Sequence, residues 1–276
     1  MLSNVLKHES RIHLMNSSTN ESSERYNIRV LDRAIQVLLC FVERGSRLTI
    51  DEVVQTTALP KSTAYRILAN LQRHGLLARN PEDETFALGS TAVLIGATAI
   101  RGLDLPQKVR PYLEQLMEAT GETAHLAILT QNHVIVVDKI DSPHPIRLVS
   151  SVGFRSPLHC TGVGKVLLAH LPERTTQRLL SAYEWRRYTP NTITDPARFA
   201  AELAEIRSQG YAVDREEFNA GLRCVAAPLR DYTGEVIAAV SVSGPSSRIG
   251  TAQIDDLAQT VLDYSRRMSQ ELGYRE

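Results

Sequence analysis

The chain has 276 residues, of which 43% are hydrophobic and 22% are charged, a composition typical of a globular protein long enough for two domains. Its 31 Lys and Arg balance its 31 Asp and Glu, so net charge alone predicts neither a nucleic-acid partner nor a membrane partner. Three widely spaced cysteines favour a reducing cytoplasm and no metal cluster, and the sequence shows neither a membrane-spanning run nor a signal-peptide pattern. We therefore expect a cytoplasmic protein without a membrane partner.

The chain begins with a polar segment over residues 1–26. The tract Asn16–Ser23 holds too few apolar residues to form a core, so this segment is predicted to be a flexible tail, and Met15 is an alternative start. An amphipathic helix is predicted next, over residues 28–44. Its apolar face consists of Leu31, Ile35, Leu38 and Val42.

Residues 48–75 carry the most informative pattern, two short helices joined by a tight turn. Thr49 and Glu52 have the spacing of a capping box at the start of the first helix. Pro60 suits the beginning of the second helix, predicted over residues 61–74, and Gly75 suits its end. The inward face of the second helix consists of Ala64, Ile67, Leu68 and Leu71. This arrangement predicts a helix-turn-helix.

The second helix also has a polar face without an evident role inside the fold. In a helix-turn-helix the second helix enters the DNA major groove, although a solvated helical hairpin explains this pattern alone equally well. The following residues favour DNA binding, because 76–79 and 85–88 form a predicted β-hairpin, the wing of a winged helix-turn-helix. Residues 25–80 also hold nine Lys or Arg against four Asp or Glu. Such a basic segment on a neutral chain fits a DNA-binding module joined to a domain with another task.

A connecting helix is predicted from Ser90 to Gly102. Its small apolar face packs either on a second copy of the chain or on its own chain. Beyond it, residues 104–274 mix strands with helices. The predicted strands are 123–129, 134–140, 146–152, 224–229 and 236–243, and the main predicted helices are those around 109–117, from 162, from 172, 195–208 and 251–272. Hairpin-like connections between these strands predict an antiparallel sheet flanked by helices, an α+β domain.

A glycine-rich turn at residues 159–165 is the first candidate for chemistry in this domain. It has only a superficial likeness to a nucleotide-binding phosphate loop, because His159 and Val166 stand where such a loop needs Gly and Ser or Thr. The remaining features are exposed N–H groups and a helix dipole that favour a small anion. The alternative is a tight turn that needs glycine for its backbone.

Two further segments could contact a ligand. Asp214 and the acidic residues after it are by themselves more typical of a charged surface loop. Ser241 and Ser243 alternate along a strand and so share one face. If that face is buried, the two hydroxyls need partners that a polar ligand would supply; on the outer face they are solvated.

Several stretches, in this order, resemble the IclR family of bacterial transcription regulators over residues 27–274. They are RAIQVL at 33–38, LPKSTAYRILANLQRHGLL at 59–77, PLHCTGVGKVLLAHLP at 157–172 and REEFNAGLRCVAAPLRDYTGEVIAAVSVSGP at 215–245. The resemblance implies a winged helix-turn-helix over 27–89, a linker helix over 90–103 and a GAF/PAS-like effector domain over 104–274. It also implies assembly as a homodimer or homotetramer.

The resemblance further implies an effector pocket for a small organic acid, with no cofactor and no catalytic residue. Two departures from the family pattern matter. Val163 is bulkier than the Ala often found there, which would reshape the pocket, and Pro60 replaces a Ser that often caps the recognition helix. The effector positions carried over from the family are Leu148, Gly162, Val163, Asp214, Cys224, Ser241 and Ser243.

The predicted function is a DNA-binding transcription regulator that an effector tunes. The predicted phosphate contacts are Thr49, Lys61, Ser62, Thr63 and Arg79, and the predicted base-edge contacts are Tyr65, Arg66 and Asn70. A dimer would place two recognition helices roughly 34 Å apart on a near-palindromic operator in double-stranded DNA.

Two other classes of protein are alternatives to a regulator. A cysteine hydrolase would use Cys160 or Cys224 with His159 or His125, but the neighbours His159 and Cys160 would point to opposite faces of a strand, and residues 27–89 would have no role. A ligand-free architectural DNA binder would leave the α+β domain superfluous. Neither explains the whole chain as well as a regulator does.

Overall fold

The computed structural model describes residues 28–45, 47–101, 104–130, 133–181 and 183–275. The chain divides into two compact units, residues 1–98 and 99–276. The predicted tail, including Asn16–Ser23 and Met15, lies outside the described residues. So do the predicted helix end at Gly102 and residues 131 and 132, which lie between two predicted strands.

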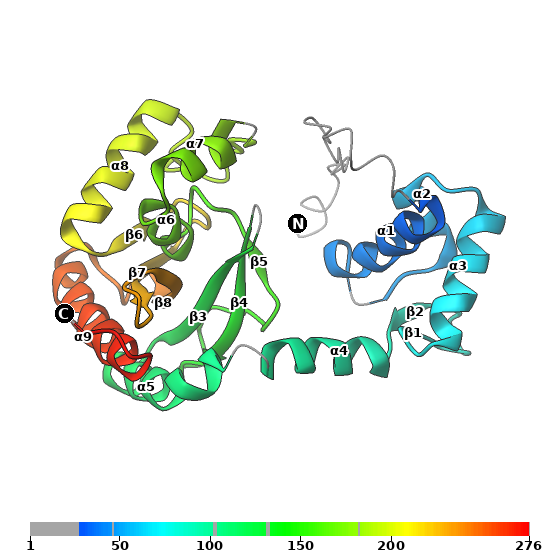
Figure 1. The fold of residues 1–276 in the computed structure, drawn as a ribbon, viewed down its shortest axis with the longest axis horizontal. Coiled ribbons are helices and arrows are strands. Elements are labelled where there is room, and N and C mark those ends of the chain that lie inside the picture. The colour runs from blue at the N-terminus through cyan, green and yellow to red at the C-terminus, as the bar shows by residue number, and fades with distance from the viewer. Residues whose placement is uncertain (1–27, 46, 102–103, 131–132, 182, 276) are drawn as a thin grey trace. The chain divides into compact units, whose positions relative to one another are not determined.

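The N-terminal unit contains three packed helices followed by a two-stranded hairpin (Figure 1). Its elements are α1 (Arg29–Glu43), α2 (Ile50–Thr57), α3 (Lys61–Arg73), β1 (Leu77–Arg79) and β2 (Phe86–Leu88), before helix α4 (Ser90–Arg101). Thr49 and Glu52 form the capping box that starts α2, and Gly75, with φ of 70°, follows α3. The predicted winged helix-turn-helix is confirmed.

Helix α1 places its predicted apolar face mostly toward solvent. Leu31, Ile35 and Val42 are 54%, 45% and 50% exposed, while the buried residues of this helix are Val37, Cys40 and Phe41. The helix therefore has apolar side chains on two sides, and only one of them contributes to the core of the unit. An exposed apolar strip of this kind is typical of a surface that binds a protein.

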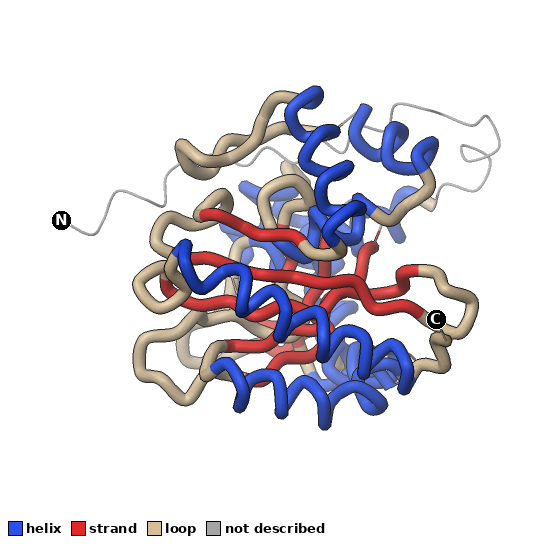
Figure 2. The backbone as a smooth tube through the Cα atoms, turned by 90° about the vertical axis from the view of Figure 1, so that its left-hand side faces the viewer, coloured by secondary structure: helices blue, strands red, loops and turns tan. Residues whose placement is uncertain are grey.

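The C-terminal unit is built on a six-stranded antiparallel sheet with the order β5-β4-β3-β8-β7-β6. The strands, red in Figure 2, are β3 (Thr123–Thr130), β4 (His133–Ile140), β5 (Arg155–Ser156), β6 (Ala212–Arg215), β7 (Leu222–Arg230) and β8 (Val236–Pro245). Strand β8 lies in the middle, with β3 paired to one of its edges and β7 to the other. The predicted α+β class with an antiparallel sheet is confirmed.

Helices cover both faces of this sheet. Helices α5 (Leu105–Thr120) and α9 (Ile254–Glu271) pack on one face and share its larger apolar core. Helices α6 (Gly162–Ala169), α7 (Glu173–Ser181) and α8 (Pro196–Gln209) belong to the other side, where a second core forms. Helix α6 lies directly on β7 and β8 of that second face, so its N-terminus begins over the middle of the sheet.

The structure differs from the predicted strands in two places. Residues 146–152 form an irregular segment rather than a strand, since Pro143 and Pro145 precede them and Val149 is 87% exposed with no neighbouring strand. The short strand β5 follows instead. Strand β6, at the opposite edge, had no prediction at all. Within the described part of the chain, no helix is both long enough and apolar enough to span a bilayer.

Candidate effector pocket and DNA-recognition surface

Helix α3 presents its polar side chains to solvent, as predicted. Ala64, Ile67, Leu68 and Leu71 are buried on the opposite side of the helix. Tyr65 is 55% exposed, and the other exposed side chains of the polar face are Lys61, Ser62, Arg66 and Asn70, with Thr63 half-buried. The N-terminal turns of α3 are therefore accessible to a duplex, and the assignment of individual base contacts stays a prediction.

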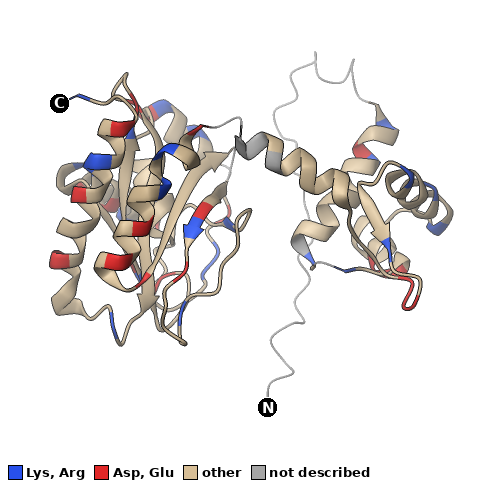
Figure 3. Ribbon diagram, turned by 90° about the horizontal axis from the view of Figure 1, so that it is seen from below, with Lys and Arg blue, Asp and Glu red and all other residues tan. Residues whose placement is uncertain are grey.

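Several of the predicted phosphate contacts have partners within the unit. The Thr49 hydroxyl belongs to the capping box, Lys61 pairs with Asp51 at 2.6 Å, and Arg79 pairs with Glu84 at 2.6 Å. The wing turn that holds Glu84 is acidic and appears red in Figure 3. Exposed ion pairs of this kind contribute about 0–1 kcal/mol, so a phosphate can replace them. The acidic turn nonetheless reduces the positive potential at the wing tip.

The register of the C-terminal sheet aligns polar residues from four strands on the face that α6 covers. Alternation along each strand places the same-face residues two apart. Directly paired residues on neighbouring strands have Cβ atoms about 5 Å apart. One row across the sheet is Thr123, Ser243, Cys224 and Asp214, and the adjacent row is His125, Ser241, Ala226 and Ala212. The first row contains the predicted effector residues of β6, β7 and one of β8.

The glycine-rich turn rests directly on these rows. Thr161 caps α6 by accepting a hydrogen bond from the Gly164 N–H at 3.2 Å. A Cβ atom on Gly162 would lie 3.1 Å from Cys224 Sγ and 3.2 Å from Ala226 Cβ, so glycine allows this close approach. The free N–H groups of the first helical turn and the helix dipole then favour an anion beside the rows.

A cavity of about 140 Å³ lies at this point of the C-terminal unit. All the predicted effector residues line it: Leu148, Gly162, Val163, Asp214, Cys224, Ser241 and Ser243. The structure thus brings together residues that are up to 95 positions apart (148 to 243) in the chain. Ser241 and Ser243 are 2% and 6% exposed, which answers the question left open by the sequence: their face is the buried one.

Sequence reasoning missed other residues of the cavity wall. The polar ones include His125 and Ser150, and the aromatic ones are Phe154 and Phe218. His125 could have been predicted from its strand, because residues two apart in a strand lie on the same face and His125 is two residues after Thr123. No pattern in the sequence indicated that Ser150 and Phe154 line the cavity, because residues 146–152 were predicted as a strand and this region is a loop.

The expectation that Asp214 belongs to a charged surface loop is wrong. Asp214 is 7% exposed on β6, and burial raises the pKa of its carboxyl group to about 7. The Glu217 N–H donates to its Oδ1 at 2.7 Å and Lys165 lies nearby, which both favour the ionised form. Pairing of β6 with β7 brings the segment inside, and that pairing is not visible in the local sequence.

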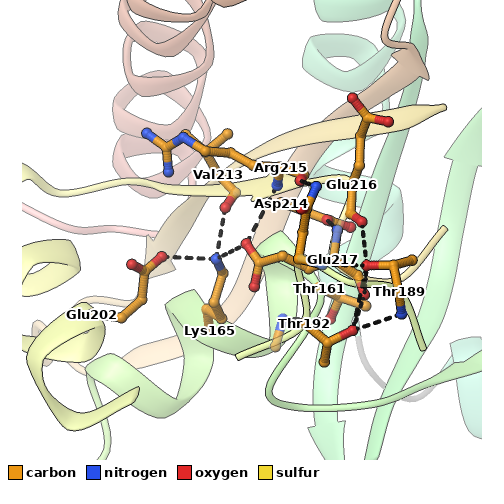
Figure 4. Close-up of polar contacts among 12 residues, drawn as sticks. Thr161, Lys165, Thr189, Thr192, Glu202, Val213, Asp214, Arg215, Glu216 and Glu217 are labelled. Carbon is orange, nitrogen blue, oxygen red and sulfur yellow. Dashed lines mark hydrogen bonds and ion pairs between the residues drawn. The ribbon is translucent and has the colours of Figure 1, made fainter. Parts of the chain in front are cut away.

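Behind Asp214, a buried lysine organises the acidic segment (Figure 4). Lys165 of α6 is fully buried, and its Nζ donates to Glu217 Oε1 at 2.6 Å, to the Val213 carbonyl at 2.7 Å and to Glu202 Oε1 at 2.8 Å. Although burial alone lowers the pKa of this amine, the two carboxylates raise it above its usual value. The charged lysine therefore holds the turn after β6 against α6.

The adjacent residues His159 and Cys160 do not form a nucleophile and base pair. His159 uses both ring nitrogens elsewhere, Nδ1 with the Tyr183 hydroxyl at 3.0 Å and Nε2 with the Arg186 carbonyl at 2.9 Å. Burial raises the pKa of the Cys160 thiol, and it raises that of Cys224 to about 11, so both stay protonated. No group of three or more His, Cys, Asp or Glu able to hold a metal ion occurs among the described residues.

Comparison with known proteins gives the family of the chain. Residues 97–270 match the family described as bacterial transcriptional regulator IclR C-terminal, and residues 30–81 match the IclR helix-turn-helix domain. The chain belongs to the IclR family of bacterial transcriptional regulators. It is a transcriptional regulator with a DNA-binding helix-turn-helix and an IclR C-terminal domain.

Similar IclR-family proteins cover nearly the same length. The chain is 38% identical to the HTH-type transcriptional regulator BhcR of Paracoccus denitrificans, over 88% of this chain and 86% of that protein. It is 32% identical to the transcriptional repressor IclR of Escherichia coli, over 89% and 90%. A crystal structure of an IclR homolog from Microbacterium hydrocarbonoxydans, complexed with 4-hydroxybenzoate, aligns with a TM-score of 0.76 and 27% identity, covering 88% of this chain and 98% of the other.

Proposed function

We propose that this IclR-family regulator changes its affinity for a near-palindromic operator when a small organic acid binds in the C-terminal unit. The observation that carries the proposal is the cavity at the N-terminus of α6. It joins an anion-favouring helix end to the buried hydroxyls of Ser241 and Ser243. A carboxylate would accept hydrogen bonds from both, and the apolar wall would bind the rest of the molecule.

The size of the cavity supports a ligand no larger than one substituted ring. An engineered cavity of about 150 Å³ in another protein binds benzene, and the cavity here has about 140 Å³. The 4-hydroxybenzoate complex of the Microbacterium homolog is consistent with this class of ligand. Neutral Asp214 would donate to a carboxylate, whereas ionised Asp214 would repel it, so we expect acid binding to favour the protonated form of this residue.

The exposed strip on α1 supports self-association in the proposed function. Two recognition helices on one operator require two copies of the N-terminal unit, and Leu31, Ile35 and Val42 offer an apolar surface for contact between them. Helix α4 adds further exposed apolar side chains: Val93, Leu94 and Ile95. We therefore propose a homodimer as the DNA-binding form, with a homotetramer as two such dimers.

The variant Ile35→Glu should weaken that dimer, because it places a charge on an apolar contact surface without touching the core of the unit. We expect analytical ultracentrifugation to show a shift toward monomer and DNA binding to lose its steep protein-concentration dependence. Asp32→Glu, a charge-conserving change on the same helix, is the matched control. An unchanged sedimentation profile for Ile35→Glu would contradict the α1 contact.

The paired variant Ser241→Ala with Ser243→Ala tests the acid site. Each hydrogen bond to a charged group contributes about 1.5–3 kcal/mol, so losing two should weaken acid binding by about a hundredfold or more. Operator affinity without acid should stay at the wild-type value, because the hydroxyls are buried in the C-terminal unit. Fluorescence anisotropy of a labelled operator, titrated with a panel of small aliphatic and aromatic acids, measures both quantities.

The exposed Ser247, which follows β8, provides the control for these variants through Ser247→Ala. It removes one hydroxyl from the same region without opening the cavity. If the double serine variant kept the wild-type acid response, the acid would have to bind elsewhere, and the proposed site would be wrong.

A further inference from the structure

His125 lines the effector cavity but is not part of the proposed carboxylate cradle. It lies on β3 directly opposite Ser241 of β8, whereas Gly162 packs against β7, one strand further on. Neighbouring strands are about 4.8 Å apart, so about 10 Å of sheet separates β7, under the start of α6, from the strand of His125, and the two serines of β8 lie between them. A substituted ring with a hydrogen bond at each end spans that distance.

The hydrogen bonding of this imidazole is incomplete. The side chain is 4% exposed, and its Nε2 lies 2.8 Å from the Ser150 hydroxyl. Among the described residues, Nδ1 has no hydrogen-bond partner. It is not one of their fully buried unpaired atoms, so it keeps accessible surface in a residue that lines the cavity, and a ligand there can become its partner.

The charge state of His125 defines what it can bind. Burial, together with the charge of Lys139, its direct neighbour on β4, lowers the pKa of His125 to about 4, although Asp141 opposes this. The ring is therefore neutral at physiological pH, with one nitrogen donating and the other accepting. Such a group recognises a hydroxyl or a carbonyl oxygen and gives little attraction to a second carboxylate.

We propose that His125 and Ser150 form a second polar subsite, which binds a hydroxyl or carbonyl group at the end of the ligand opposite its carboxylate. The inference rests on the proposed acid-sensing function and deepens it. The sensor would select bifunctional acids, hydroxy acids or keto acids whose second oxygen is about one ring away from the carboxylate, over the parent acids that lack this oxygen.

Ser150 also connects the subsite to the loop that closes the cavity. The Lys139 Nζ donates to the Ser150 carbonyl at 2.6 Å, and Arg248 donates to the Ile146 carbonyl at 2.9 Å, so the loop is tied to the sheet at two points. Leu148 and Phe154 of the same loop line the cavity. A ligand that bonds His125 and Ser150 would thus stabilise the closed position of this loop.

Two matched pairs of acids test the inference by calorimetry on the full-length protein: 4-hydroxybenzoate with benzoate, and levulinate with valerate. We expect the first member of at least one pair to bind about tenfold more tightly than its partner, the effect of one net hydrogen bond. His125→Phe should remove this preference, because it weakens binding of the oxygen-bearing acid more than binding of its parent acid. Ser150→Ala should reduce the preference in part.

The controls separate ligand recognition from a purely structural role. His133→Phe, at the exposed end of β4, should leave the affinities for both acids of a pair unchanged. If His125 only fixed the loop, His125→Phe would weaken both members of a pair equally, and this result would overturn the inference. Should His125→Phe fail to fold, as judged by Trp185 fluorescence, Ser150→Ala carries the same comparison because its side chain belongs to a surface loop.

The remaining outcomes distinguish this inference from the proposed function. Wild-type protein that binds parent and substituted acids equally would overturn the His125 subsite and leave acid sensing intact. Wild-type protein that binds none of the four acids, at concentrations up to the millimolar range, would overturn the acid-sensing proposal and the subsite with it.

Discussion

The variant Lys165→Met should lower the free energy of unfolding of the C-terminal unit by about 3–5 kcal/mol. Methionine keeps most of the aliphatic stem, so the loss comes from the charge rather than from a cavity. Without the ammonium group, the buried carboxylate of Glu217 loses its partner at 2.6 Å and Glu202 loses one at 2.8 Å. The Val213 carbonyl also loses its 2.7 Å hydrogen bond from Nζ.

The arrangement of Glu217 makes this loss large. Its side chain is 4% exposed, and its Oε2 has no hydrogen-bond partner in the described part of the chain. Lys165 thus provides the main stabilising partner of a buried carboxylate whose hydrogen bonding is already incomplete. Because the Glu217 N–H donates to Asp214, we also expect the variant to disturb the cavity and to weaken acid binding.

Tryptophan fluorescence can measure this effect on one unit alone. Trp185 is the single tryptophan of the chain, and it packs against Phe199 of α8 in the C-terminal unit, with ring centroids 5.1 Å apart. Urea unfolding followed at Trp185 therefore reports the C-terminal unit. The exposed Lys108→Met on α5 is the matched control and should change the free energy of unfolding by less than about 0.5 kcal/mol.

A companion variant separates ion pairing from packing. Adding Glu217→Gln to Lys165→Met removes the stranded carboxylate, so the double variant should recover part of the lost stability. A destabilisation of Lys165→Met below about 1 kcal/mol, equal to that of a surface pair, would show that the buried network contributes little to the fold.

The variant Arg66→Ala should remove most of the sequence preference of DNA binding, at a cost of about 1–3 kcal/mol for the selected operator. Arg66 is exposed on the polar face of α3, two turns or fewer from the helix start, where a recognition helix reads base edges. Arginine can donate two parallel hydrogen bonds to guanine, and alanine donates none. Affinity for unrelated duplexes should fall much less.

An operator for this test can be selected by the wild-type protein from a random pool of duplexes. The ratio of the dissociation constants for the operator and for a scrambled duplex, measured at one salt concentration, gives the specificity. Arg44→Ala, an exposed arginine beyond the end of α1, removes the same charge away from α3 and is the matched control. An unchanged specificity ratio for Arg66→Ala would remove this residue from the base-reading set.

Local patterns in the sequence were sufficient to predict the helix-turn-helix and its wing. The capping box at Thr49, the left-handed Gly75 and the buried stripe of α3 depend on residues within one or two helical turns. The wing follows directly in the chain, so its hairpin is also a local feature. For the same reason the glycine-rich start of α6 and the shared face of Ser241 and Ser243 could be predicted.

For α1 and β6, which side chains are buried was decided only by the tertiary structure. The apolar face predicted for α1 lies largely in solvent, because the other side of the helix fits against α2 and α3. Asp214 is inside, because β6 pairs with β7 and Lys165 balances the local charge. Residues 146–152 have strand-forming composition but form a loop, since no neighbouring strand is available to them.

The sequence by itself thus determined the order of the elements, the winged helix-turn-helix and the identity of several residues that meet at the cavity. The tertiary structure decided how strands distant in the chain pair, and therefore that His125 stands beside Ser241 and that a loop with Ser150 closes the cavity over them. Strand pairing depends on contacts between distant residues, and the periodicity of a single segment does not specify its partner.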